Sequence, residues 1–259
     1  MSFWEILQSF FKIIISLFTS LLTFLGIITG QNEEIIQTVV CEIPAQGEVR
    51  TVQGACQDGN FIYISQINSS GTDARIIKYN LSFELVSISE NLALDHANDL
   101  TYCAQTNEIA VSNNEPNFTT VTFVNADTLT VTKSVGLSEP LYAIEYVGDE
   151  NCYYTGISYT YKIVKYNENF EKISEIPLFD NGLTRQGIAI NGDKIYCVYS
   201  GENSIYQYDF SGSLIKSVTL PESDNEAESL FFLNDTPYVV YNIPGTGNGG
   251  IIYKLEGAF

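Results

Sequence analysis

Short runs in which apolar and polar residues alternate make up most of the chain after residue 34. Runs such as 61–65, 109–112 and 195–200 are rich in Tyr, Val and Ile, which favour half-buried strands. Gly, Asn and Asp residues that favour tight turns separate the runs. The pattern predicts an all-β protein.

A phrase of four residues recurs five times within these runs. The copies begin at Gln53, Asn98, Tyr142, Gln186 and Glu228, at intervals of 45, 44, 44 and 42 residues. Further strand-like runs follow each copy. A period in the forties built from short strands is typical of β-propeller blades, because each four-stranded blade buries its faces only against its neighbours. We therefore expect a five-bladed β-propeller.

The last copy of the repeat is incomplete, since the chain reaches residue 259 after the run 251–255. A spare strand-like run at 35–43 precedes the first copy and belongs to no repeat of its own. We expect this run to supply the missing strand and to close the ring, which removes exposed strand edges. The expected propeller spans 31–259, with blades at about 48–92, 93–137, 138–181, 182–223 and 224–259.

Residues 1–30 differ from the rest in being hydrophobic and predict a helix. Seventeen residues from Ile13 to Thr29 carry no charge, close to the lower limit for a membrane span. An uncleaved anchor ranks first, with Lys12 inside and the propeller on the extracytoplasmic side of the cell membrane. A cleaved signal peptide that yields a secreted protein ranks second. A helix lying at the membrane interface, suggested by a polar stripe, ranks third.

The composition limits the partners. Lys and Arg total 12 against 31 Asp and Glu, and the net charge of −19 argues against nucleic acid. The five cysteines are widely spaced with no C-x-x-C pair, so we expect buried free thiols rather than a zinc or redox site.

The repeat predicts where a site would form, because the first strand of each blade lines the central channel. One level holds the five residues that open the copies, Gln53, Asn98, Tyr142, Gln186 and Glu228. The level two positions earlier holds Thr51, His96, Pro140, Thr184 and Glu226, and Asp99 and Arg185 are adjacent. Side chains from distant parts of the sequence therefore meet near one channel mouth.

These side chains allow three interpretations. His96 could exchange protons near neutrality with Glu226, Glu228 or Asp99 as partners, which makes these four the candidate catalytic residues. Gln53, Asn98, Tyr142, Arg185 and Gln186 are candidate ligand-binding residues; calcium could join the carboxylates and amides, and Arg185 could hold a carboxylate. Otherwise the polar groups only bind one another or water and keep the blades in register.

The blade openings also resemble known propellers. Gln53-Gly54, the run 96–102, Gln186-Gly187 and the run 226–229 look like those of exported bacterial β-propeller proteins of unassigned function. The pair Gln53-Gly54 is similar to the first-blade opening of the five-bladed glutaminyl-peptide cyclotransferases. The chain lacks the later acidic-glycine and tryptophan motifs of that family, so its activity is not carried over.

Two functions remain open from the sequence. The first is a tethered or exported binding module that recognises a protein, peptide or glycan at the channel mouth and needs no cofactor. The second is a hydrolase, lyase or cyclase that acts through His96 with Glu226, Glu228 and Asp99, with or without a cation. We favour the first because no catalytic motif is present.

Overall fold

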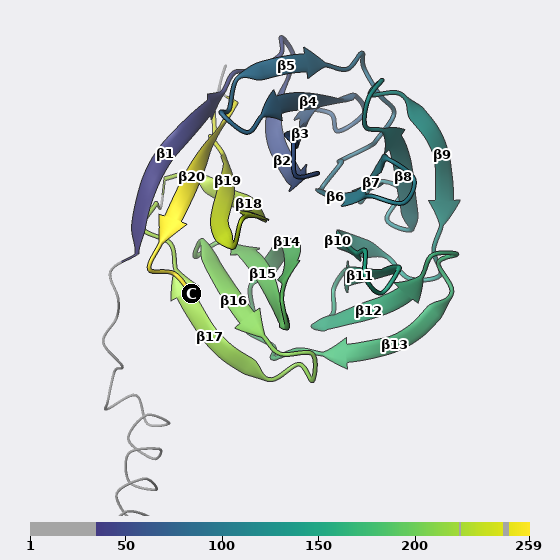
Figure 1. The fold of residues 1–259 in the computed structure, drawn as a ribbon, viewed down its shortest axis with the longest axis vertical. Helices are drawn as coiled ribbons and strands as arrows, with labels where there is room; N and C mark the ends of the chain where they lie inside the picture. Colours follow the sequence, from purple (N-terminus) through teal and green to yellow (C-terminus); the bar gives the residue numbers. More distant parts are fainter. Residues whose placement is uncertain (1–34, 223, 246–248) are drawn as a thin grey trace, which may run out of the picture. The chain divides into compact units, whose positions relative to one another are not determined.

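The computed structural model describes residues 35–222, 224–245 and 249–259 (Figure 1). The helix and membrane segment expected at 1–30 lie outside the described residues. Within them, none of the secondary structure is a helix with the length and hydrophobicity to span a bilayer. The compact unit spans Ile35–Phe259, and its strands confirm the all-β prediction.

The described strands form five four-stranded antiparallel sheets arranged around a central axis, which confirms the five-bladed propeller (Figure 1). Blade one contains β2 (Val49–Gln57), β3 (Phe61–Asn68), β4 (Ala74–Asn80) and β5 (Leu85–Ile88). Blade two contains β6 (Asp99–Cys103), β7 (Glu108–Ser112), β8 (Thr120–Asn125) and β9 (Val131–Gly136). Blade three contains β10 (Leu141–Val147), β11 (Cys152–Ile157), β12 (Lys162–Asn167) and β13 (Lys172–Pro177). Blade four contains β14 (Thr184–Asn191), β15 (Lys194–Ser200), β16 (Ser204–Tyr208) and β17 (Leu214–Thr219). Blade five contains β18 (Glu226–Leu233), β19 (Thr236–Asn242), β20 (Gly250–Glu256) and β1 (Ile36–Ile43).

The N-terminal strand closes the ring as expected. β1 runs antiparallel to β20, from Ile36 opposite Glu256 to Ile43 opposite Gly250. The Gln37 side chain strengthens the junction, because its Nε2 donates to the Tyr241 hydroxyl and its Oε1 accepts from the Glu222 backbone N–H, both at 2.8 Å. The outer edge of β20 is thereby paired within the protein.

The turn between the third and fourth strands of blades one to four has one chemical cause. An Asn or Asp ends the third strand, and its side-chain oxygen accepts hydrogen bonds from backbone N–H groups two to four residues later. These residues are Asn80, Asn125, Asn167 and Asp209. Such Asx-type turns reverse the chain without backbone partners from another strand.

The hydrophobic core lies between neighbouring blades rather than in one central mass. Between blades three and four, for example, Tyr154 and Ile163 pack with Ile188 and Cys197. All five cysteines are buried free thiols, as the sequence predicted. Each blade is therefore stabilised chiefly by its two neighbours.

Glycine permits the closest approach of the inner strands at the axis. A Cβ atom on Gly54 would lie 2.7 Å from the Asp99 Cα, and one on Gly187 would lie 2.9 Å from the Glu228 backbone oxygen. Neither position leaves room for a side chain. At these second positions of the repeated phrase, the inner strands of neighbouring blades thus approach one another too closely for a side chain.

Candidate functional site

Equivalent positions of the repeat lie at the same level along the channel. The Asn98 side chain, first in its copy, donates Nδ2 to the backbone oxygens of Tyr142 at 3.1 Å and Gln186 at 2.9 Å, each first in its own copy. At the other end of the same strands, Thr101 donates to Glu145. The inner strands therefore run in one direction. We call the mouth where they begin the leading end and the mouth where they finish the trailing end.

At the leading end, hydrogen bonds connect residues of blades two to five. Besides the bonds made by Asn98, the Gln186 Nε2 donates to the Glu226 Oε1 at 3.1 Å. Asn114, which the sequence did not single out, donates its Nδ2 to the Asn98 Oδ1 at 3.1 Å. These polar side chains form hydrogen bonds with other channel residues, as expected of side chains that keep the blades in register.

Gln53, the blade-one member of this level, is buried. Its Nε2 donates to the Val52 backbone oxygen at 3.0 Å, while its Oε1 has no partner among the described residues. Within those residues, no group of three or more His, Cys, Asp or Glu side chains is arranged to hold a metal ion. The calcium site therefore stays a prediction from the amide and carboxylate composition.

Asp99 lies at the axis and is fully buried. One carboxylate oxygen accepts from the backbone N–H groups of Ile144 at 3.1 Å and Ile188 at 3.2 Å, and the other accepts from the Ser229 hydroxyl at 3.2 Å. Burial raises the pKa of Asp99 well above its ordinary range, although the two backbone donors oppose this. This candidate catalytic residue links blades two, three, four and five.

At the leading end, burial and neighbouring carboxylates shift the pKa values of Glu228 and His96. Burial and the carboxylate of Glu226 raise the pKa of Glu228 well above its ordinary value. Burial lowers the pKa of His96 below 6.5, while Glu115 and Glu226 oppose that shift. Among the described residues, no hydrogen bond joins the His96 imidazole to Glu226, Glu228 or Asp99. His96 instead lines a separate cavity of about 510 Å³ with Glu115.

Arg185 lines a second cavity at the leading end, of about 260 Å³, between blades three and four. Its side chain is only 6 % exposed, and Nη1 donates to the Lys162 backbone oxygen at 3.1 Å. Nε has no partner, and no carboxylate pairs with Arg185 in the part of the chain that the structure describes. Gly156 makes the space, because a Cβ there would lie 2.9 Å from the Arg185 Nη1.

Aromatic side chains form the rim of the Arg185 cavity. Tyr142, Tyr159 and Tyr161 line it, and Tyr159 is 79 % exposed. The Tyr159 ring contacts those of Tyr142 and Phe118, with centroids 6.1 Å away in both cases. A buried cation and an exposed aromatic ring therefore line the same cavity.

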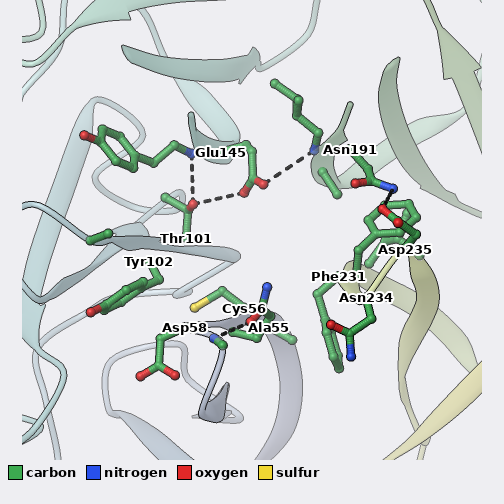
Figure 2. Close-up of a pocket in the computed structure, with 18 residues that line it drawn as sticks. Ala55, Cys56, Asp58, Thr101, Tyr102, Glu145, Asn191, Phe231, Asn234 and Asp235 are labelled. Carbon is green, nitrogen blue, oxygen red and sulfur yellow. Dashed lines mark hydrogen bonds between the residues drawn. The ribbon is translucent and has the colours of Figure 1, made fainter. Parts of the chain in front are cut away.

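The trailing end holds a cavity of about 490 Å³ that the sequence analysis did not identify (Figure 2). The fourth residue of every copy of the repeat lines it: Cys56, Thr101, Glu145, Ala189 and Phe231. The sequence signal for this cavity is the carboxylate of Glu145 among these positions, where a buried strand end normally carries an apolar or small neutral residue.

Glu145 contributes a carboxyl group to this trailing cavity from the inner strand β10. Its Oε2 accepts from the Thr101 hydroxyl at 3.0 Å, and its Oε1 accepts from the Ile190 backbone N–H at 3.5 Å (Figure 2). Burial raises the pKa of Glu145 to about 8, although both donors oppose the rise. A carboxyl group that titrates near neutrality in a cavity can bind cations or transfer protons.

Comparisons with known proteins agree on architecture. No protein-family model matches the chain, and no curated protein matches it in sequence. The crystal structure of glutaminyl cyclase from Myxococcus xanthus is similar, with a TM-score of 0.63 and 11 % identity over 86 % of this chain and 96 % of that one. The chain is thus a five-bladed propeller that shares its fold with a glutaminyl cyclase.

A second solved structure is more distant. Hydrazine synthase from Kuenenia stuttgartiensis gives a TM-score of 0.48 and 14 % identity, over 77 % of this chain and 58 % of that one.

Proposed function

We propose that the propeller is a binding module that recognises a peptide through a carboxylate group at the leading end of the channel. The observation that carries this proposal is Arg185, a guanidinium that lines a cavity and is paired with no carboxylate of the described residues. An arginine stays charged at any physiological pH, and a buried charge is costly unless a counter-charge meets it.

The lack of a carboxylate partner for Arg185 among the described residues contrasts with the acidic composition of the chain. Acidic residues outnumber basic ones by 31 to 12, so carboxylates were available in abundance to pair with Arg185. Nearby, Lys162 has two such partners, Glu139 at 2.5 Å and Glu175 at 2.9 Å. Leaving Arg185 without one supports a role for a carboxylate supplied from outside.

The surrounding side chains suit a peptide. Tyr142, Tyr159 and Tyr161 offer rings for apolar contact and hydroxyls for hydrogen bonds, the mixture enriched at recognition sites. The cavity of about 260 Å³ is small and accommodates a terminal residue rather than a long segment.

Calorimetric titration with N-acetylated amino acids tests the proposal, with the matching amides, which lack the carboxylate, as ligand controls. We expect the acids to bind, the amides to bind at least about tenfold more weakly, and Arg185→Met to abolish the difference. Arg75→Met is the matched protein control, because the Arg75 side chain donates to Asn91 at 2.8 Å and lies outside this cavity.

A second variant guards against a folding defect in Arg185→Met. Tyr159→Ala removes a largely exposed ring and should weaken binding without changing the melting temperature. Equal affinity for acids and amides would overturn the proposal, as would a preference for glucuronate over every acetylated amino acid.

The enzymatic alternative is a hydrolase, lyase or cyclase acting through His96 with Glu226, Glu228 and Asp99. The described residues provide no hydrogen bond between His96 and these carboxylates, so the geometry favours binding. Turnover of a peptide that His96→Ala abolishes at an unchanged melting temperature would favour the alternative.

We also propose that residues 1–30 hold the propeller at the cell membrane on its extracytoplasmic side, or direct its secretion. The uncharged stretch from Ile13 to Thr29 supports this proposal. The full chain should fractionate with membranes or the culture medium, whereas a chain that begins at Ile35 should do neither. Equal distribution of the two forms would contradict it.

A further inference from the structure

The trailing cavity is built by all five blades and faces away from the Arg185 site. Its walls are the ends of the inner strands and the turns that follow them, from Ala55–Gly59 in blade one to Leu230–Asp235 in blade five. At about 490 Å³ it is nearly twice as large as the Arg185 cavity, and it falls within the range of small-molecule sites. Figure 2 shows polar and aromatic side chains from opposite blades around one space.

The charged residue types that line this cavity are all acidic. Asp58, Glu145 and Asp235 contribute carboxyl groups, and none of the lining residues, all within the described part of the chain, is Lys, Arg or His. Asp58 and Asp235 already accept protein hydrogen bonds, the first from Tyr63 at 2.7 Å and the second from Asn191 at 3.2 Å. Glu145 lies on the inner strand β10, whereas Asp58 and Asp235 lie in turns between strands, so Glu145 is the carboxyl group best placed to receive a ligand inside the cavity.

The hydrogen bonds of Glu145 leave it with acceptor capacity. A carboxylate has about four lone-pair positions, and the protein supplies one good donor, the Thr101 hydroxyl, and one distant donor, the Ile190 N–H at 3.5 Å. Glu145 still has part of its surface open to the cavity. A bound cation could thus reach the carboxylate without displacing Thr101.

Aromatic rings complete the wall, and their orientations are fixed from outside. Tyr102 and Tyr146 donate their hydroxyl hydrogens to Asn107 at 3.0 Å and Asn151 at 2.6 Å, both in turns. The Phe231 ring stacks on the Tyr238 ring, with 5.4 Å between the two ring centroids. Of these rings, Tyr102 keeps part of its surface exposed, and an exposed aromatic ring can attract an organic cation through its π-electrons.

We propose that the trailing cavity is a second ligand site, which binds an organic ammonium ion between the Glu145 carboxylate and the surrounding rings. The site is independent of the leading end, since it takes a ligand of the opposite charge and shares no lining residue with the Arg185 cavity. The protein would then recognise an anion at one mouth and a cation at the other.

Calorimetric titration of the intact chain with choline and with n-butylamine tests the proposal. The neutral isostere 3,3-dimethylbutan-1-ol serves as the ligand control. We expect choline or n-butylamine to bind at least about tenfold tighter than the alcohol. The tighter of the two shows whether the site prefers a quaternary or a primary ammonium group. Equal binding of amine and alcohol, no amine binding, or tight binding of Ca²⁺ alone would overturn it.

Two variants locate the ligand. Glu145→Gln keeps the shape of the side chain and should weaken amine binding at least about tenfold. Glu168→Gln makes the same substitution at an exposed position outside the cavity and should leave affinity unchanged. Equal effects of the two variants would mean that only the net charge attracts the amine, which would contradict the proposal.

A measurement on the unsubstituted protein keeps the test decisive even if Glu145→Gln does not fold. A cation favours the ionised carboxylate, so amine binding at neutral pH should release protons from the protein. Titrations in buffers of different ionisation enthalpy measure that release. Amine binding without any release would place the ligand away from Glu145.

Discussion

The Ser229 hydroxyl donates a hydrogen bond to the Asp99 carboxylate at 3.2 Å, although 130 positions separate the two residues in the sequence. The same hydroxyl oxygen accepts from the Ala55 backbone N–H at 3.2 Å. Together with the Asp99 bonds to Ile144 and Ile188, this network touches all five blades. The buried Asp99 carboxyl group can accept hydrogen bonds from three other blades only when the ring is closed.

Replacing Asp99 with alanine should lower the free energy of unfolding by about 3 kcal/mol or more, because two buried backbone N–H groups lose their acceptor. Denaturant unfolding measures the loss. Asp149→Ala, at an exposed position, is the control and should change stability by less than about 0.5 kcal/mol. Similar values for the two variants would mean that Asp99 does not hold the blades together.

Glu145 should make the protein less stable as the pH rises. Its pKa is about 8 in the folded state against an ordinary 4.5, so the folded protein binds this proton more tightly than the unfolded chain does. Its contribution is therefore present below 4.5 and is lost progressively as the pH rises to about 8, with a slope of up to about 1.4 kcal/mol per pH unit.

The slope can be assigned by substitution. Asp99 and Glu228 also have raised pKa values and contribute with the same sign, whereas His96, whose pKa is lowered, stabilises the fold as the pH rises through its titration. Glu145→Gln should therefore flatten the curve of unfolding free energy against pH only in part. An unchanged slope in Glu145→Gln would contradict the pKa shift.

The close approach at Gly54 predicts that even one methyl group is harmful. Gly54→Ala would put a Cβ 2.7 Å from the Asp99 Cα, and the resulting shift of two inner strands should cost about 1–3 kcal/mol of unfolding free energy. Gly136→Ala is the matched control, since a Cβ there meets no atom within 4 Å. Equal stability of the two variants in denaturant titrations would contradict the tight contact.

The closing strand should be indispensable for a monomeric ring. A chain that begins at residue 44 lacks β1, so it should melt more than about 10 °C below one that begins at Ile35 and should associate through the exposed edge of β20. Melting curves and size-exclusion chromatography measure both effects. A peptide of residues 35–43 added in trans should restore the monomer, and a stable monomer without it would refute the role of β1.

The architecture was predictable because it depends on a period. Copies of one phrase spaced by 42 to 45 residues, together with the spare run before the first copy, determine both the number of blades and the closing strand. The same period predicted that Asn98 and Gln186 share one level and that Glu226 lies at the adjacent level of the same mouth, since equivalent repeat positions share a level. The bonds of Asn98 and Gln186 agree with it.

Side-chain surroundings were not predictable in the same way. Asn98 and Asp99 are neighbours in sequence, yet one belongs to a polar layer at the mouth and the other is enclosed at the axis. The position of the Arg185 guanidinium depends on the room that Gly156 provides in another blade. The trailing cavity depends on how far apart five strand ends lie, and the residue types do not encode that distance.

Blade five joins strands from both ends of the chain, and this has a consequence for biogenesis. During vectorial synthesis β1 emerges before any other described strand but finds its partner only when β20 has been made. Until then the edge of β1 that pairs with β20 has no partner strand. Blade five can therefore be completed only after synthesis has reached Glu256.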